Sequence, residues 1–88
     1  MTWKIEFDDR AARELRKLDQ HVQHRILSFL RERIATADNP RRLGTALTGS
    51  LSGLWRYRIQ DYRLICLIED DRLVVLILRV GHRKNIYY

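Results

Sequence analysis

The stretch that decides the fold is residues 54–66, which read LWRYRIQDYRLIC. Its first arm alternates between apolar and cationic side chains in the order Trp55, Arg56, Tyr57, Arg58 and Ile59. Side chains alternate across a pleated backbone, so this arm predicts a strand with one apolar and one cationic face. We expect the apolar face to turn inward and the arginines to turn outward.

The residues that follow predict a hairpin. Gln60 and Asp61 fit a two-residue turn, although they lack the glycine that such turns favour. The second arm runs from Tyr62 to Ile68 and brings a third arginine, Arg63. Arginines beside aromatic rings suit a polyanion whose bases can stack, so RNA is the first partner to consider.

The composition predicts a single folded domain over residues 1–88. The chain is 45% hydrophobic and 32% charged, a balance typical of a globular protein rather than a disordered one. Seventeen Lys and Arg against eleven Asp and Glu give a net charge of +6, which favours nucleic acid, an acidic protein or a membrane surface as partner. All but three of the basic residues are arginines, whose planar groups bind phosphate and stack on bases, and this favours nucleic acid over lipid.

Other features point to the cytoplasm. Charges interrupt the N-terminal residues, so we expect no signal peptide, and the longest apolar run, residues 73–78, is too short to span a bilayer. The single cysteine, Cys66, excludes an internal disulfide framework and fits a reducing compartment. Its apolar neighbours predict a buried side chain.

The N-terminal half predicts one strand and two helices. Residues 2–7 alternate like a half-buried strand. Asp8 or Asp9 then caps a first helix, and Asp19 caps a longer second helix that ends near Pro40. Both helices carry an apolar stripe that can cover one face of a sheet.

The remaining chain completes an α+β fold. Residues 40–53 form a connector in which residues 45–47 are either a helical turn or a short strand. After the hairpin, a turn at residues 69–71 leads to a last strand at residues 73–79. The order is therefore strand, two-helix hairpin and three antiparallel strands, with both helices on one face of the sheet and a polar opposite face.

Several candidate residues have more than one interpretation. The hairpin arginines, joined by Arg83 of the tail, either bind phosphate or form a solvated face that discourages edge-to-edge aggregation. Tyr87 and Tyr88 either have a functional role, in which they stack on a base or take part in proton transfer, or simply pack their rings on the sheet edge. His82 is either a general base or a loop histidine.

The sequence contains no metal or cofactor signature. His21 and His24 are three apart on a helix but have no carboxylate or cysteine partner at ligand spacing. RNA cleavage without a metal needs charge stabilisation, which arginines supply, and proton transfer, for which arginine and free tyrosine are poor bases. The residues alone therefore favour RNA binding over a complete catalytic site.

The pattern resembles the RelE/ParE superfamily of bacterial type II toxins and is most similar to its RelE branch. The resemblance covers nearly the whole chain and rests on residues 7–11 (FDDRA), 54–58 (LWRYR), 61–65 (DYRLI) and 80–83 (VGHR). It implies a RelE-like fold and a metal-independent endoribonuclease that cuts mRNA in the ribosomal A site by 2′-hydroxyl attack on the adjacent phosphate.

The implied partners are the ribosome, mRNA and a neutralising antitoxin in a hetero-oligomeric complex, with no cofactor and no membrane. Two alternatives stay open. A ParE-like toxin shares the fold but inhibits DNA gyrase by protein binding. A non-catalytic nucleic-acid-binding module shares the basic surface.

The resemblance also implies roles for five residues. Arg56 and Arg58 match a pair of basic residues near the 2′-hydroxyl and the phosphate. Arg63 matches the arginine that stabilises the transition state. Arg83 matches the arginine that assists the leaving 5′-oxygen, and Tyr87 matches the tyrosine that stacks on the substrate base.

Two departures from the family pattern matter. The paired positions are usually lysines, which can act as a base when their pKa is depressed, whereas Arg56 and Arg58 do not readily release a proton. Proton acceptance then falls to His82, to Tyr87 or to the ribosome. The tail is also short, so the functional tyrosine is either Tyr87 or Tyr88.

Overall fold

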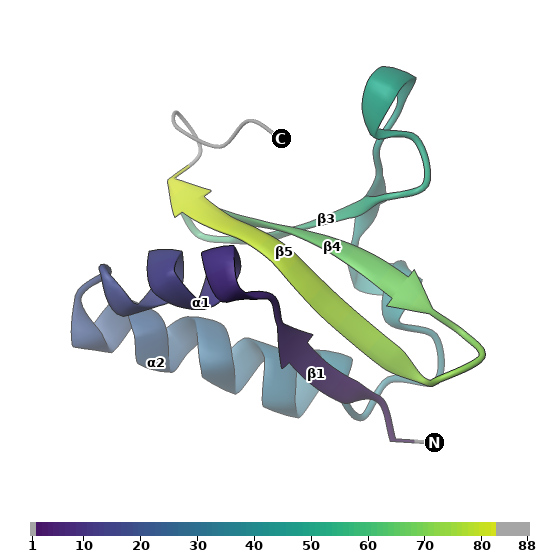
Figure 1. Ribbon diagram of the computed structural model, residues 1–88. Helices are drawn as coiled ribbons and strands as arrows, with labels where there is room; N and C mark the ends of the chain where they lie inside the picture. Colours follow the sequence, from purple (N-terminus) through teal and green to yellow (C-terminus); the bar gives the residue numbers. More distant parts are fainter. Residues whose placement is uncertain (1, 83–88) are drawn as a thin grey trace.

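A computed structural model describes residues 2–82 of the chain (Figure 1). The elements follow in the order β1 (Lys4–Phe7), α1 (Asp9–Arg16), α2 (Gln20–Phe29), the π-helical η1 (Leu30–Ile34), the 3₁₀ turn η2 (Pro40–Leu43), β2 (Thr45–Ala46), the 3₁₀ turn η3 (Gly49–Leu51), β3 (Trp55–Ile59), β4 (Tyr62–Glu69) and β5 (Val74–His82). No helix of this described part is long and apolar enough to cross a membrane.

The five strands form one mixed sheet in the order β1-β5-β4-β3-β2. Strands β3, β4 and β5 form the predicted antiparallel meander, which confirms the α+β class. The sheet has one strand more than predicted, because residues 45–47 supply the short strand β2, which pairs with β3. Strand β1 runs parallel to β5 and forms the opposite edge of the sheet.

The two helices begin where the sequence predicts, but only one has the predicted cap. Asp8 Oδ1 accepts a hydrogen bond from the Ala11 N–H at 2.8 Å and so caps α1. Asp19 occupies the same position before α2, but its side chain makes no capping hydrogen bond. The predicted Asp19 cap was therefore wrong.

The second helix ends earlier than predicted. Its last turn widens into η1, where the Ala35 N–H donates to the Leu30 carbonyl at 2.8 Å, and helical backbone stops at Ile34 rather than near Pro40. The Ala35 carbonyl instead accepts from the Trp3 N–H at 2.8 Å. The Ala35 carbonyl, which would accept a hydrogen bond within a longer helix, is therefore used by the backbone that leads into β1.

Two strands differ in length from the prediction. Strand β1 begins at Lys4, later than the predicted start at Thr2. Strand β5 continues past the predicted end at Arg79, because it keeps pairing with β4 until His82 lies opposite Tyr62.

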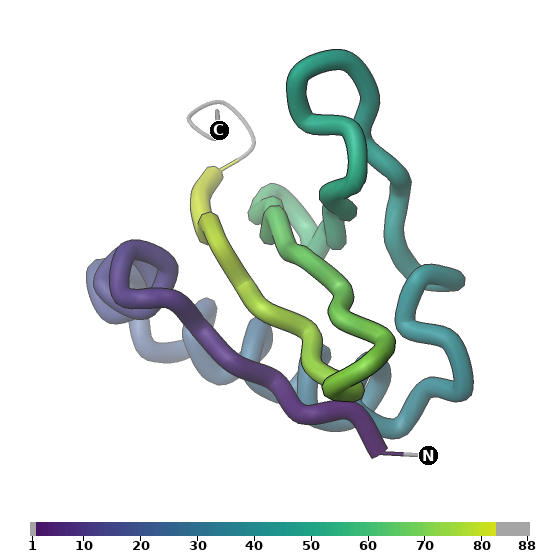
Figure 2. The backbone as a smooth tube through the Cα atoms, turned by 45° about the vertical axis from the view of Figure 1, so that its right-hand side comes forward, coloured from purple at the N-terminus to yellow at the C-terminus, as the bar shows by residue number. Residues whose placement is uncertain are grey.

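Helices α1 and α2 lie together on one face of the sheet, as predicted (Figure 1). The connector between α2 and β3 runs along the sheet edge opposite β1 (Figure 2). The core between helices and sheet contains buried apolar side chains from both layers: Ala11, Leu15, Ile26, Leu30, Ile34, Tyr57, Leu64, Cys66, Val75 and Ile77. Cys66 is fully buried, as predicted, and burial raises the pKa of its thiol to about 12.

Candidate functional site

The face of the sheet away from the helices carries three of the predicted site residues. Arg56 and Arg58 are exposed, whereas Tyr57 between them is fully buried. Arg58 lies directly opposite Arg63 on β4, which places their Cβ atoms about 5 Å apart on one face. We call this surface, made by Arg56, Arg58 and Arg63, the arginine face.

The hairpin turn orients Arg63. The Arg63 guanidinium donates to the carbonyl of Gln60 at 3.2 Å and to the carbonyl of Tyr62 at 3.3 Å. Gln60 has a φ of 54°, in the left-handed region, which closes the predicted two-residue turn without a glycine. The cationic group is therefore held by the backbone of the turn beside it.

Three ion pairs lie at the other end of the sheet, whereas Asp61 lies in the hairpin turn next to Arg63. Within residues 2–82, Arg56 and Arg58 have no hydrogen bond or ion pair. The surface ion pairs near the turn between β4 and β5 join Arg72 to Glu6 and Glu69, and Arg41 to Asp70. Like charges repel across paired strands. An anion at the arginine face would reduce this repulsion, because several guanidinium groups could bind it at once.

Sequence reasoning missed a fourth arginine on this face, Arg79. Ile65 pairs with Arg56 on one side and with Arg79 on the other, so the three side chains share a face. Simple alternation would place Arg79 with the buried Ile77, but one extra residue in β5, Leu78, reverses the pattern. The sequence did contain one indication of a special role for Arg79, which is an arginine within an otherwise apolar strand.

Arg79 is paired inside the protein. It is 8% exposed, and its Nε and Nη2 donate to the carboxylate of Glu14 at 2.9–3.2 Å. Burial acts to raise the pKa of Glu14, but the hydrogen bonds from Arg79 and from the Val80 N–H, with the Arg79 charge, hold the pKa below its ordinary value. Arg79 therefore secures α1 to the sheet.

The arginine face is less polar than predicted. Ile65 is 4% exposed and Val74 is 3% exposed, although neither side chain points toward the helices. Ile65 lies in register between two arginines, whose aliphatic stems can cover an apolar neighbour. The predicted polar face therefore holds for the exposed Arg56 and Arg58 but not for Ile65 and Val74.

The structure does not bring His82 to the arginine face. His82 pairs with Tyr62, and their rings make an edge contact with centroids 5.6 Å apart. Tyr62 immediately precedes Arg63 in β4, so the two point to opposite faces, and His82 shares the face of Tyr62. The other predicted tail residues lie outside the described part of the chain: Arg83, Tyr87 and Tyr88.

Tyr57 is a structural residue. Its hydroxyl donates to the Pro40 carbonyl at 2.6 Å, and its ring packs edge-on against Phe29 at 5.8 Å. Burial raises the pKa of this hydroxyl above its ordinary value. Tyr57 therefore ties the connector to the hairpin and takes no part in surface proton transfer.

The predicted absence of a metal site was based on His21 and His24, both of which are exposed on α2. Residues 2–82 contain no group of three His, Cys, Asp or Glu side chains placed to hold a metal ion. The chemistry available at the described site is that of fixed positive charge.

Comparison with known protein sequences gives consistent results. A family model for the ParE toxin of the type II toxin–antitoxin system parDE matches residues 5–87. Toxin RelG of Mycobacterium tuberculosis is 33% identical over 87 residues, which cover 99% of this chain and 98% of RelG. The mRNA interferase toxin RelE of Escherichia coli K12 is 29% identical, over 97% of this chain and 87% of that toxin.

Solved structures share the fold. The toxin–antitoxin complex RelBE2 of Mycobacterium tuberculosis contains a chain with a TM-score of 0.86 and 30% identity, matched over 97% of this chain and 95% of that one. The isolated Escherichia coli RelE toxin gives a TM-score of 0.71 and 26% identity over 91% of this chain and 83% of that chain. Sequence and fold lead to one conclusion: this chain belongs to the RelE/ParE superfamily of type II toxin–antitoxin toxins, in its RelE branch.

Proposed function

We propose that this toxin is a metal-independent endoribonuclease that cuts mRNA in the ribosomal A site. The observation that carries the proposal is the arginine face, where Arg58 and Arg63 lie directly opposite each other on paired strands. Attack of a 2′-hydroxyl on phosphorus concentrates negative charge on the phosphate, and preorganised guanidinium groups stabilise that charge. A relative with 29% identity is named an mRNA interferase, which supports the same activity.

The proposed roles follow the order of the reaction. Arg56 and Arg58 bind the scissile phosphate and orient the 2′-hydroxyl, whose oxygen bonds to phosphorus as its proton leaves. Arg63 stabilises the charge of the transition state. The bond from phosphorus to the 5′-oxygen then breaks, and that oxygen takes a proton from water while the positive charge of Arg83 stabilises it and Tyr87 stacks on the base.

The proton acceptor lies outside the arginine face. Arginine stays protonated at physiological pH, so Arg56, Arg58 and Arg63 cannot take the proton of the 2′-hydroxyl. His82 is on the opposite face of the sheet. We therefore assign proton acceptance to Tyr87 or to a group of the ribosome, and in the second case cleavage would depend on the ribosome.

We further propose a cognate antitoxin. Relatives of this chain have been solved as toxin–antitoxin complexes, including RelBE2 of Mycobacterium tuberculosis and a RelE–RelB complex of Pyrococcus horikoshii. The net charge of +6 suits a partner with an acidic toxin-binding segment.

The test compares two arginine-to-alanine variants with a matched control on another surface. After induction in growing bacteria, Arg58→Ala and Arg63→Ala should relieve growth arrest and restore protein synthesis, because each removes a charge from the phosphate site. Lys17→Ala, an exposed cation at the end of α1, should remain as toxic as the wild-type chain. Full toxicity of both arginine variants would reject the site.

A second candidate function is inhibition of DNA gyrase by protein binding. The observation that favours it is the family model, whose description names the ParE toxin. Measuring DNA damage and protein synthesis after induction separates the two candidates. Early DNA damage with normal protein synthesis would support gyrase inhibition, whereas an immediate loss of protein synthesis supports RNA cleavage.

A further inference from the structure

Gly81 lies on the arginine face, at the end of a row of residues that crosses three strands. Arg58 of β3 pairs with Arg63 of β4, and Arg63 pairs in turn with Gly81 of β5. Residues directly opposite each other on paired strands share one face of the sheet. The position beside Arg63, on the side away from Arg58, therefore carries no side chain.

The backbone of β5 does not require a glycine at this position. Gly49 and Gly53 have φ angles of 65° and 96°, which favour glycine, whereas Gly81 lies in regular strand pairing and has no positive φ. The extra residue that forms the irregularity in β5 is Leu78, earlier in the strand. Glycine weakens the interior of a strand and often marks a place where a ligand or another backbone comes close.

Close packing between layers explains another glycine of the chain but not Gly81. A Cβ atom at Gly44 would lie 3.1 Å from Tyr57 Cε1 and 3.2 Å from the Arg56 carbonyl oxygen, so the connector and the sheet leave no room there. Helices α1 and α2 lie on the face of the sheet opposite to the arginine face (Figure 1). Within residues 2–82 all five strands belong to the sheet itself, so no second layer of helices or strands covers Gly81 on this face.

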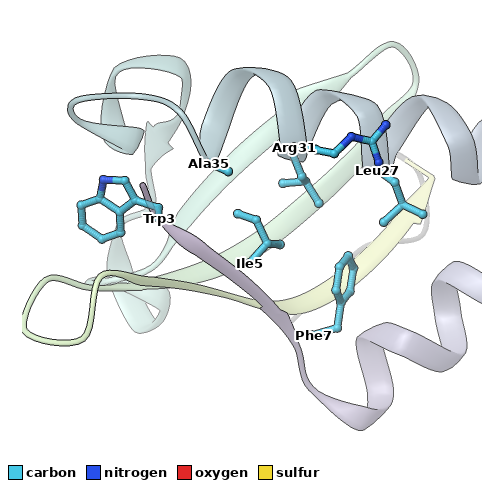
Figure 3. Close-up of a pocket in the computed structure, with 7 residues that line it drawn as sticks. Trp3, Ile5, Phe7, Leu27, Arg31 and Ala35 are labelled. Carbon is cyan, nitrogen blue, oxygen red and sulfur yellow. The ribbon is translucent and has the colours of Figure 1, made fainter. Parts of the chain in front are cut away.

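A pocket on the helix side of the sheet is less suitable for a phosphate. It has a volume of about 310 Å³ and lies between β1 and the segment formed by α2 and η1. Figure 3 shows Ile5 and Phe7 of β1 pointing toward Leu27 and Arg31 on the helical side. Moving a charged phosphate next to these apolar side chains is costly, and the lining offers it one guanidinium. The arginine face offers several.

We propose that Gly81 positions the substrate for RNA cleavage, because the scissile phosphate and its ribose lie directly over it. The sugar–phosphate backbone would then approach the sheet closely, and Arg58 and Arg63 would donate to the phosphate oxygens. A side chain at position 81 would hold the phosphate away from these donors. The inference rests on the proposed RNA cleavage and adds a steric requirement to that site.

Small displacements at this position should have large effects. The Arg63 guanidinium bonds to the carbonyls of Gln60 and Tyr62 at 3.2 and 3.3 Å, which limits how far it can follow a displaced phosphate. A misplacement of about 1 Å can lower the rate of a positioned reaction about a hundredfold. Even the methyl group of alanine is large enough to cause such a displacement.

Side chains of increasing size at position 81 test the proposal. The reaction is single-turnover cleavage of an mRNA held in ribosomes, at saturating toxin. Gly81→Ala should lower the cleavage rate at least about tenfold and Gly81→Val should lower it further. Both variants should unfold at the temperature of the wild-type chain or above it, since glycine is unfavourable within a strand. Full cleavage by Gly81→Val would overturn the proposal.

The matched control is Ala46→Val, which adds bulk to an exposed residue of β2. Ala46 pairs with Trp55, which alternates with Arg56 along β3, so Ala46 lies on the face opposite to the arginine face. This variant should cleave like the wild-type chain. A loss of thermal stability in Gly81→Ala that parallels its loss of cleavage would instead show that the chain itself needs the glycine for packing, and would also overturn the proposal.

Phosphate binding separates this inference from RNA cleavage. The probe is inorganic phosphate, titrated into the free toxin at low ionic strength while amide resonances are recorded. We expect Arg58, Arg63 and Gly81 to shift together, and Gly81→Val to weaken phosphate binding about tenfold. No shift at Gly81, or equal affinity of the variant, would overturn the proposal. A wild-type toxin that binds phosphate in this way but cuts no RNA would refute the proposed activity and leave the phosphate position over Gly81 supported.

Discussion

Glu14 of α1 and Arg79 of β5 are 65 positions apart in sequence and form an ion pair with an Nη2–Oε2 distance of 2.9 Å. Glu14 also accepts a hydrogen bond from the Val80 N–H at 2.9 Å. Strand β1 pairs with β5 only from Val74 to Ile77, so within residues 2–82 the edge of β5 beyond that point has no neighbouring strand. The Glu14 carboxylate takes the place of that strand and holds the segment of β5 that leads to the tail.

Replacing Glu14 with glutamine should destabilise the fold by about 2 kcal/mol. The amide oxygen can still accept from Val80, but the Arg79 guanidinium would lose its ion pair with the Glu14 carboxylate. Urea denaturation measures the change in the free energy of unfolding. The matched control is Glu32→Gln on the exposed side of η1, which should differ from the wild-type chain by less than about 0.5 kcal/mol. Equal stability of the two variants would contradict the role of Glu14.

The same pair predicts how stability depends on pH. The pKa of Glu14 is lower in the folded chain than its ordinary value of 4.5, so the unfolded chain binds a proton more readily. The contribution of Glu14 is therefore complete at neutral pH, and it is lost as the pH falls below 4.5 and through the folded pKa. Between pH 7 and pH 3 the wild-type chain should lose more stability than Glu14→Gln. Parallel pH profiles would show that the pair contributes nothing.

Tyr57→Phe should lower the free energy of unfolding by about 1–2 kcal/mol, because it leaves the buried Pro40 carbonyl without its hydrogen bond. Tyr62→Phe is the control, since within residues 2–82 its hydroxyl makes no hydrogen bond and its ring is partly exposed. Thermal unfolding of the three proteins compares them directly. Similar losses in both variants would mean that the Pro40 contact is not what stabilises the connector.

Gln60→Gly should stabilise the hairpin by about 0.5–1 kcal/mol. Gln60 has a φ of 54°, a backbone conformation that is less favourable in energy for a residue with a Cβ atom than for glycine. Asp61→Gly, at the next position of the same turn, should instead lower stability slightly, because Asp61 is not in the left-handed region and glycine only adds freedom to the unfolded chain. Chemical denaturation should show changes of opposite sign in the free energy of unfolding for the two variants. Changes of the same sign would contradict the prediction.

Local patterns predicted the parts of this molecule that depend on neighbouring residues. The alternation from Trp55 to Ile59 specified which side chains turn inward, since a pleated strand has a period of two. The same rule placed Arg56 and Arg58 outward and Arg63 on the same face once the two-residue turn fixed the register.

Features that depend on distant residues could not be read from the sequence. Nothing in residues 2–7 indicates that β1 pairs with β5 and runs parallel to it, because pairing is decided by the packed sheet. The extra residue in β5 changes the face of Arg79, and only the observed register reveals it. The same register separates His82 from the arginine face, which removes one of the predicted proton acceptors.

We propose above that the arginine face cleaves RNA on the ribosome. The most direct measurement is the mapping of mRNA 5′ ends in growing cells after brief induction of the toxin. We expect new ends inside codons of translated messages, absent from untranslated regions and absent in cells that express Arg63→Ala. Growth arrest without new 5′ ends, or equal cleavage of translated and untranslated RNA, would contradict the account.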